Sequence, residues 1–107
     1  MSGPGWRRVP AADGMALGEM LACELDGALV AVYRLDDGSF HATENVCSHA
    51  FALLTEGWLD GAEVECPLHA GRFDVRTGRA LCPPVDRAVA VYEVRVEAGE
   101  VFVNIGA

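Results

Sequence analysis

The chain has 107 residues, enough for one domain that buries roughly 60 to 70% of its unfolded surface and can fold without a disulfide or a structural metal. It is 51% hydrophobic, yet it has neither an uncharged apolar run of the ~18 to 20 residues that cross a bilayer nor a secretory signal pattern. We therefore expect a soluble cytoplasmic protein without a membrane partner, in which disulfides are unfavoured. Sixteen acids oppose eight basic residues, all arginine, and the net charge of −8 argues against nucleic acid as a partner. The excess of acidic side chains either keeps the protein soluble or helps it to dock a partner protein with a basic surface.

Short β-strands are predicted from the first third of the chain onward. Two apolar segments flank Asp26-Gly27, a dipeptide that strongly favours a two-residue hairpin. Asp37-Gly38 then turns the chain into a third strand. These three segments are MLACEL (20–25), ALVAVYRL (28–35) and SFHATENV (39–46). In front of them, DGMALGEMLA (13–22) is the one segment in which we expect a turn or two of helix.

The rest of the chain continues in the same way. Turns are expected at Asp60-Gly61, Thr77-Gly78 and Ala98-Gly99. The strands next to them are AEVEC (62–66), RFDV (72–75), VAVYEVRVE (89–97) and EVFVNI (100–105). Apolar and polar residues alternate in the last two, as in half-buried antiparallel strands. The fold class predicted for residues 1–107 is all-β, a single small antiparallel sandwich or barrel.

Two cysteines and two histidines are gathered in the middle of the chain. Cys47 and His49 form a C-x-H pair, and Cys66 and His69 form a C-x-x-H pair, with 16 residues between His49 and Cys66. Each pair can hold one metal site from a tight turn. The intervening LLTEGWLDGAEVE (53–65) can carry the chain out and back, so we expect the two loops to converge on one site.

Three kinds of chemistry compete for these four side chains. A zinc module is reasonable for two thiolates and two imidazoles, although such modules usually pair cysteine with cysteine and histidine with histidine. A thiol protease would need a lone nucleophile with a distant base and would leave one pair unused. Mixed pairs fit a [2Fe–2S] centre in which two histidines replace two cysteines on one iron.

The motif C-x-H-x16-C-x2-H, together with ECPLHAGRFDVRTGRALCPPV (65–85), resembles the Rieske-type ferredoxins of bacterial aromatic-ring-hydroxylating dioxygenase systems. The resemblance implies one [2Fe–2S] cluster, with Cys47 and Cys66 on one iron and His49 and His69 on the other, nearer the surface. It also implies a cluster-binding subdomain at about residues 45–84 on an antiparallel β base.

Other branches of the Rieske group match less well. Respiratory-chain members add a cysteine to each ligand loop, where this chain has Ala52 and Leu68, and they carry a membrane anchor. Terminal oxygenases usually have a tryptophan where this chain has Gly71, and they add a large catalytic domain for which 107 residues leave no room. The small Rieske subunit of an NAD(P)H nitrite reductase is the remaining alternative.

The resemblance implies one-electron transfer without catalytic residues. The electron arrives from a flavin-containing, NAD(P)H-dependent ferredoxin reductase and leaves to the terminal oxygenase, and the carrier is expected to be a monomer. High-potential relatives have serine and tyrosine hydroxyls that donate to cluster and cysteine sulfurs, at positions that correspond to Gly71 and Phe73. Without these donors the potential should lie near the low end of the Rieske range, at roughly −150 mV.

Several residues outside the motif have plainer interpretations. Cys23 and Cys82 have no histidine at ligand spacing and are expected to be small buried hydrophobic residues, and His41 to be a strand histidine. Trp58 is expected to pack in or at the edge of the core, unless it faces a partner. Pro83-Pro84 either ends a strand or, by the resemblance, belongs to a loop that covers the cluster.

Overall fold

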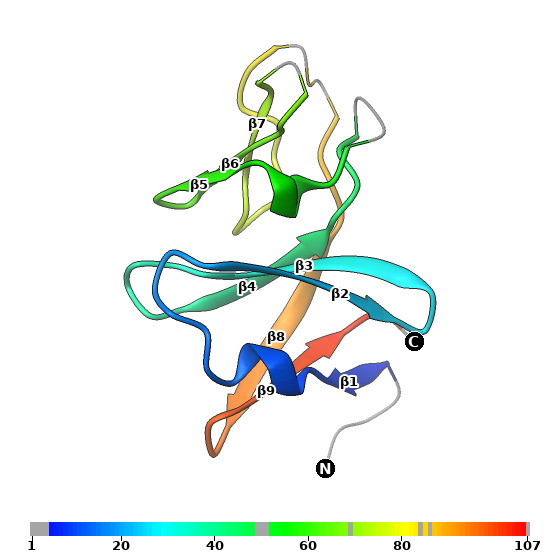
Figure 1. Ribbon diagram of the computed structural model, residues 1–107. Helices are drawn as coiled ribbons and strands as arrows, with labels where there is room; N and C mark the ends of the chain where they lie inside the picture. The colour runs from blue at the N-terminus through cyan, green and yellow to red at the C-terminus, as the bar shows by residue number, and fades with distance from the viewer. Residues whose placement is uncertain (1–4, 49–51, 69, 84, 86, 107) are drawn as a thin grey trace.

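The computed structural model describes residues 5–48, 52–68, 70–83, 85 and 87–106. A six-stranded antiparallel sheet forms a base, and a three-stranded antiparallel sheet stands on one side of it (Figure 1). The base has the order β1-β9-β8-β4-β3-β2 and the small sheet the order β5-β6-β7. The base strands are β1 (Trp6–Arg8), β2 (Met20–Leu25), β3 (Ala28–Arg34), β4 (Phe40–Glu44), β8 (Val91–Glu97) and β9 (Glu100–Asn104). The small sheet contains β5 (Trp58–Asp60), β6 (Glu63–Glu65) and β7 (Arg72–Asp74), and two 3₁₀ turns complete the list, η1 (Pro10–Ala12) and η2 (Leu54–Glu56).

The predicted fold class is confirmed, and the hairpins form where the turn residues predict them. Asp26 and Gly27, between β2 and β3, have φ angles of 50° and 87°, and Ala98 and Gly99, between β8 and β9, have φ angles of 52° and 79°. Two successive left-handed residues are the mark of a turn whose twist matches that of the strands it joins. Aspartate and glycine favour this conformation, so the local sequence is sufficient to specify the β2–β3 hairpin, whereas alanine disfavours it and Ala98 is held there by the pairing of β8 with β9.

The helix expected over residues 13–22 is wrong. Gly18 has a φ angle of 84°, which no helix contains, and its N–H donates to the carbonyl of Arg34 at 2.7 Å. Arg34 in turn donates its N–H to the carbonyl of Glu19 at 3.0 Å. The segment thus pairs with the end of β3 and enters β2 in an extended form, so the long-range hydrogen bonds override its weak helical pattern.

Two apolar cores share strand β3, which lies second from the edge of the base. Val30 and Val32 pack into the base core, whereas Ala31 and Tyr33 point to the opposite face and pack beneath the small sheet. All four are fully buried, because alternate residues of a strand face opposite sides and β3 is covered on both. Strand β3 therefore joins the base to the region that holds the cysteine motif.

Among the described residues, no helix is long and apolar enough to span a bilayer.

Candidate metal centre

The loop that follows β4 places Cys47. The loop closes where the N–H of Cys47 donates to the carbonyl of Ala52 at 2.9 Å. Asn45, only 2% exposed, ties its two ends together. Its carbonyl accepts the N–H of Leu54 at 2.7 Å, and its side-chain amide both accepts the N–H and donates to the hydroxyl of Thr55, each at 2.9 Å. Asn45 is a positioning residue that the sequence interpretation missed, because the motif does not include it.

A tighter loop between β6 and β7 places Cys66. The N–H of Cys66 donates to the carbonyl of Gly71 at 2.7 Å, which closes a six-residue turn. Ala70 lies in the left-handed region with a φ angle of 59°, and the backbone N–H of Leu68 points to the sulfur of Cys66. A loop that folds back in this way leaves backbone N–H groups free to donate to sulfur.

The two loops bring Cys47 and Cys66 together. Their side chains belong to one buried cluster and are 4% and 1% exposed. Burial raises the pKa of the Cys66 thiol, the N–H of Leu68 lowers it, and the neighbouring Cys47 thiol raises it. All four cysteines of the chain are free thiols. The predicted convergence of the two loops is confirmed for the cysteines, whereas His49 and His69 lie outside the described residues.

A third segment, of which Cys82, Pro83, Val85 and Arg87 are described, contacts both loops. The hydroxyl of Ser48 donates to the carbonyl of Arg87 at 2.6 Å, and the guanidinium of Arg87 donates to the carbonyl of Ser48 at 3.3 Å. The thiol of Cys82 approaches the carbonyl of Ala70 at 3.9 Å. Cys82 and Cys23 are only half-buried, so full burial was the wrong expectation for both. The loop that covers the cluster in relatives was expected here, and Pro84 lies outside the described residues.

Gly71 has no room for a side chain. A Cβ atom at this position would lie 2.5 Å from Cγ1 of Val85, which is itself 5% exposed in the same core. A serine at position 71 therefore fits only if Val85 moves. Phe73 is fully buried and belongs to the same core cluster as Cys47 and Cys66.

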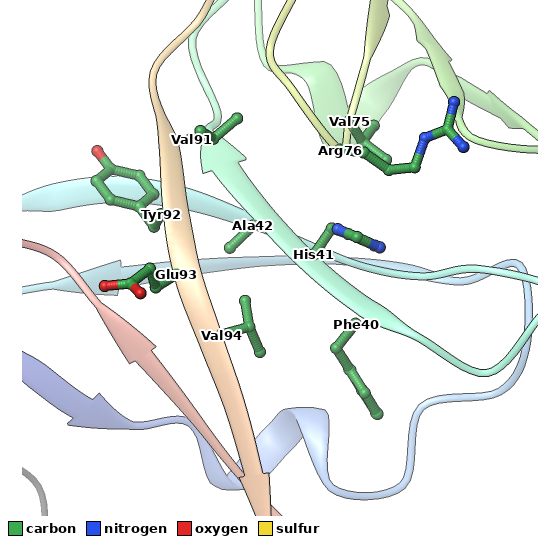
Figure 2. A pocket seen from close by; sticks show the side chains of 9 residues that line it. All are labelled: Phe40, His41, Ala42, Val75, Arg76, Val91, Tyr92, Glu93 and Val94. Carbon is green, nitrogen blue, oxygen red and sulfur yellow. The ribbon is translucent and has the colours of Figure 1, made fainter.

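A groove of about 340 Å³ separates β4 and β8 from the chain that follows β7 (Figure 2). His41 on β4 and Arg76 after β7 both lie at this opening, and Nε2 of His41 is 3.0 Å from the hydroxyl of Ser39. Burial lowers the pKa of His41, Asp37 and Asp74 raise it, and Arg76 lowers it. The histidine is a strand residue at the junction of the two sheets, as expected.

Within the described part of the chain, no three histidine, cysteine or acidic side chains lie together in a way that could hold a metal. Two of the four predicted ligands are outside that part. What the described residues supply is a pair of adjacent buried thiols on two converging loops. Thiolate sulfur is the ligand type that suits both zinc and iron–sulfur clusters, so the pair alone does not choose between them.

Comparison with known proteins favours an iron–sulfur cluster over zinc. The family model for the Rieske [2Fe-2S] domain matches residues 5–93. The ferredoxin component of the p-cumate 2,3-dioxygenase system of Pseudomonas putida is 46% identical over 99 residues, which cover 91% of this chain and 83% of the relative.

Solved structures agree with this result. A complex of reduced oxygenase and oxidized ferredoxin in carbazole 1,9a-dioxygenase contains a chain that is 43% identical, with a TM-score of 0.88 and coverage of 95% of this chain and 94% of that chain. A putative NADH-dependent nitrite reductase small subunit from Mycobacterium tuberculosis is 33% identical, with a TM-score of 0.83 and coverage of 95% and 96%. Both neighbours have the same fold as this chain, and the first has the higher sequence identity.

Proposed function

Because this chain belongs to the Rieske [2Fe-2S] domain family, we propose that it carries single electrons within an aromatic-ring-hydroxylating dioxygenase system. It takes an electron from a flavin-containing, NAD(P)H-dependent reductase and delivers it to the terminal oxygenase. It is a monomer of the cytoplasm and has no catalytic residues of its own. The observation that carries the proposal is the pair of buried, adjacent thiols of Cys47 and Cys66 on two converging loops, in a chain this similar to dioxygenase ferredoxins.

The residues present fit an iron–sulfur cluster. Cys47 and Cys66 would bind one iron through sulfur, and His49 and His69 would bind the other through ring nitrogen, which gives one [2Fe–2S] cluster per chain. The cluster supplies a one-electron centre at a potential well above that of four-cysteine ferredoxins, about −150 to +300 mV against roughly −400 mV. Burial of both thiols is consistent with sulfur ligands that are kept away from water and oxidants.

The chain's own residues shape this centre. The backbone N–H of Leu68 lowers the pKa of the Cys66 thiol and so favours negative charge on that sulfur. The clamp made by Asn45 and Thr55 fixes the end of the first loop, and the contact between Ser48 and Arg87 holds that loop to the third segment. Together these contacts limit the movement of the ligand loops between oxidation states, which favours fast electron transfer.

We assign residues 1–107 to one domain and about residues 45–84 to its cluster-binding subdomain. The small sheet, both cysteine loops and the core beneath them all fall in or next to this range. The subdomain rests on β3, whose Ala31 and Tyr33 form the floor of its core.

Two alternatives are distinguishable from this proposal. The solved nitrite reductase small subunit supports an assimilatory nitrite reductase role less well, since its identity of 33% is below the 43% of the carbazole dioxygenase chain. A zinc module is disfavoured because the matched family is defined by an iron–sulfur cluster.

The test begins with the anaerobically purified protein. We expect a coloured protein with two irons and two sulfides per chain and the EPR spectrum of a histidine-ligated cluster after reduction with dithionite. Adding the protein to a mixture of a purified ferredoxin reductase and a ring-hydroxylating oxygenase should restore NADH-driven product formation. A colourless protein with stoichiometric zinc would overturn the cofactor assignment. A cluster-bearing protein that supports nitrite reductase but no oxygenase would overturn the partner assignment.

A further inference from the structure

The outer face of the small sheet carries an ordered set of side chains, of which Trp58, Asp60 and Glu63 are exposed and the others half-buried. Trp58 on β5, Glu65 on β6 and Arg72 on β7 lie directly opposite one another in one cross-strand row. A second row contains Asp60, Glu63 and Asp74. Residues in register point to the same face of a sheet, and the opposite face holds Leu59, Val64 and Phe73, which pack into the core. The polar rows therefore face outward.

The second row is three carboxylates side by side. Like charges directly opposite each other on a sheet cost stability unless cations offset them. Arg76 pairs with Asp74 at 3.1 Å, and the Asp74 side chain is only 18% exposed. One cation, Arg72, serves three of the acids on this face, at 2.8 Å from Glu65, 3.3 Å from Glu63 and 3.5 Å from Asp60. The side chains of Asp60 and Glu63 nevertheless remain 79% and 48% exposed. The face thus keeps an excess of negative charge that is open to a partner.

The first row begins with an exposed aromatic ring. Trp58 is 60% exposed, although tryptophan is usually well buried, and it lies on β5, the outermost strand of the small sheet. At the other end of the row Leu81 is 39% exposed, and its N–H donates to the carbonyl of Arg72 at 2.8 Å. Exposed tryptophan beside carboxylates offers both apolar area and an attractive surface for a cation.

This face also borders the candidate metal centre. Glu65 directly precedes Cys66, and Arg72 directly follows Gly71, so the first row flanks the base of the second cysteine loop. Most acidic residues lie outside this region. Residues 45–84 hold five acids and three arginines, whereas the remaining chain holds eleven acids and five arginines. A partner attracted by net charge alone would meet the base at least as often as this face.

We infer that the outer face of the small sheet, which we call the Trp58 face (Trp58, Asp60, Glu63, Glu65, Arg72, Asp74 and Leu81), docks a redox partner protein through arginine or lysine side chains on that partner. Asp60 and Glu63 attract the basic groups, and Trp58 supplies the apolar anchor on which one of them stacks. The inference rests on the proposed electron-carrier function and assigns it a contact surface beside the Cys66 loop.

Carbodiimide cross-linking to cytochrome c, a basic redox protein, tests the location of the contact. The reagent joins a carboxylate to a lysine that touches it, and mass spectrometry then identifies the residues that were joined. We expect cross-links from Asp60 and Glu63 in preference to Glu24 and Asp36, which are exposed acids of the base with no ion pair to any described residue. Cross-links confined to the base would overturn the inference. This measurement needs no electron transfer, so it is independent of the proposed function.

Stopped-flow reduction of cytochrome c by the dithionite-reduced protein tests the energetics. The variant Asp60→Asn/Glu63→Gln should lower the second-order rate constant about five-fold at low ionic strength, and salt should diminish the difference. Glu65 still pairs with Arg72 in this variant, so the sheet stays intact. The matched control, Glu24→Gln/Asp36→Asn, removes the same charge from the base and should change the rate less than about two-fold.

The aromatic anchor needs its own comparison. Trp58→Ala should slow the reaction about three-fold or more, with a loss that persists at high salt, and Trp58→Phe should recover part of it. Leu17→Ala, at an exposed apolar residue of the base that is 55% exposed, is the control and should have no effect. Equal losses in the test and control variants, or none in either, would overturn the inference. The EPR spectrum of each variant shows whether the cluster itself is intact, and its absence in the wild type would instead contradict the proposed function.

Discussion

The base sheet and the small sheet are built from the same kind of hairpin but are held together differently. In the base, β3 and β8 have seven residues each, and the sheet encloses a core of its own. The three strands of the small sheet have three residues each. Strands this short are not stable as an isolated sheet. They depend on the face of β3 beneath them and on the loops that hold Cys47 and Cys66.

The base serves as the scaffold, whereas the small sheet and its loops form the region that holds the candidate metal centre. The base is closed by its own strand pairs, including the long-range pairs β4–β8 and β1–β9, whereas the small sheet also requires contacts outside itself, including the buried floor formed by Tyr33. The hydroxyl of Tyr33 lies 2.9 Å from that of Thr43, which satisfies a buried polar group at this boundary, and burial raises the pKa of Tyr33 to about 12. Regions with few independent contacts open first, so the cluster-binding region should be the less stable of the two.

The largest expected effect comes from the proposed ligands. Replacing His49 or His69 with alanine, or Cys66 with serine, should abolish the cluster or make it labile, because an open iron position admits water. The base should keep its β-sheet signal, since its core contains none of these residues. Visible absorbance and far-UV circular dichroism follow the two regions separately. Cys23→Ser and Cys82→Ser are the controls, and a protein bleached by Cys23→Ser but not by Cys66→Ser would show that the ligand assignment is wrong.

Core truncations test whether the two regions lose stability independently. Leu54 is fully buried beneath the small sheet and Met15 is 5% exposed in the base core, and alanine at either position should cost about 2–5 kcal/mol of unfolding free energy. Only Leu54→Ala should accelerate loss of the cluster under native conditions. Denaturant titration followed by visible absorbance and by circular dichroism should give separated transitions for that variant. Coincident transitions in both variants would show one cooperative unit.

The redox potential should respond only to contacts in the core beneath the small sheet. We expect a wild-type potential near −150 mV. Phe73→Tyr should raise it by tens of millivolts, provided the new hydroxyl reaches a sulfur, because a hydrogen bond to sulfur gains strength as negative charge accumulates. Protein-film voltammetry makes the measurement, and a wild-type value above about +100 mV would contradict our reading of the missing donors.

Position 71 supplies the control for that series. Gly71→Ser alone should destabilise the protein by about 1–3 kcal/mol through overpacking against Val85. The double variant Gly71→Ser/Val85→Ala makes room for the side chain, so a rise in potential should appear only there. A rise of equal size in Gly71→Ser alone would mean that Val85 moves aside without cost.

The smallest effect is expected at the junction of the two regions. Since burial lowers the pKa of His41 in the folded protein, the unfolded chain binds a proton there first as the pH falls. The contribution of His41 to stability is therefore complete above the ordinary histidine pKa of about 6.5 and is lost progressively below it. His41→Gln should flatten the pH dependence of the melting temperature between about pH 7 and 5. An unchanged slope would show that Asp37 and Asp74 offset the burial of the protonated ring.

Much of this molecule was predictable from local sequence. Asp26-Gly27 can adopt the left-handed turn that closes the β2–β3 hairpin, and this property depends only on the turn residues. The spacing of the four candidate ligands predicted two converging loops, and the structure confirms this for Cys47 and Cys66, because the intervening β5–β6 hairpin returns the chain to its starting point.

Tertiary structure alone decided the features that depend on residues far apart in the chain. The pairing of Gly18 with Arg34 replaced an expected helix, and the contact of Val85 with Gly71 closed a position that the sequence left open. The alignment of Trp58 with Glu65 and Arg72 into one row on the outer face depends on the register of three strands. Turn residues and ligand spacings are encoded within a few positions, whereas register, steric closure and surface charge arise only when separate segments pack together.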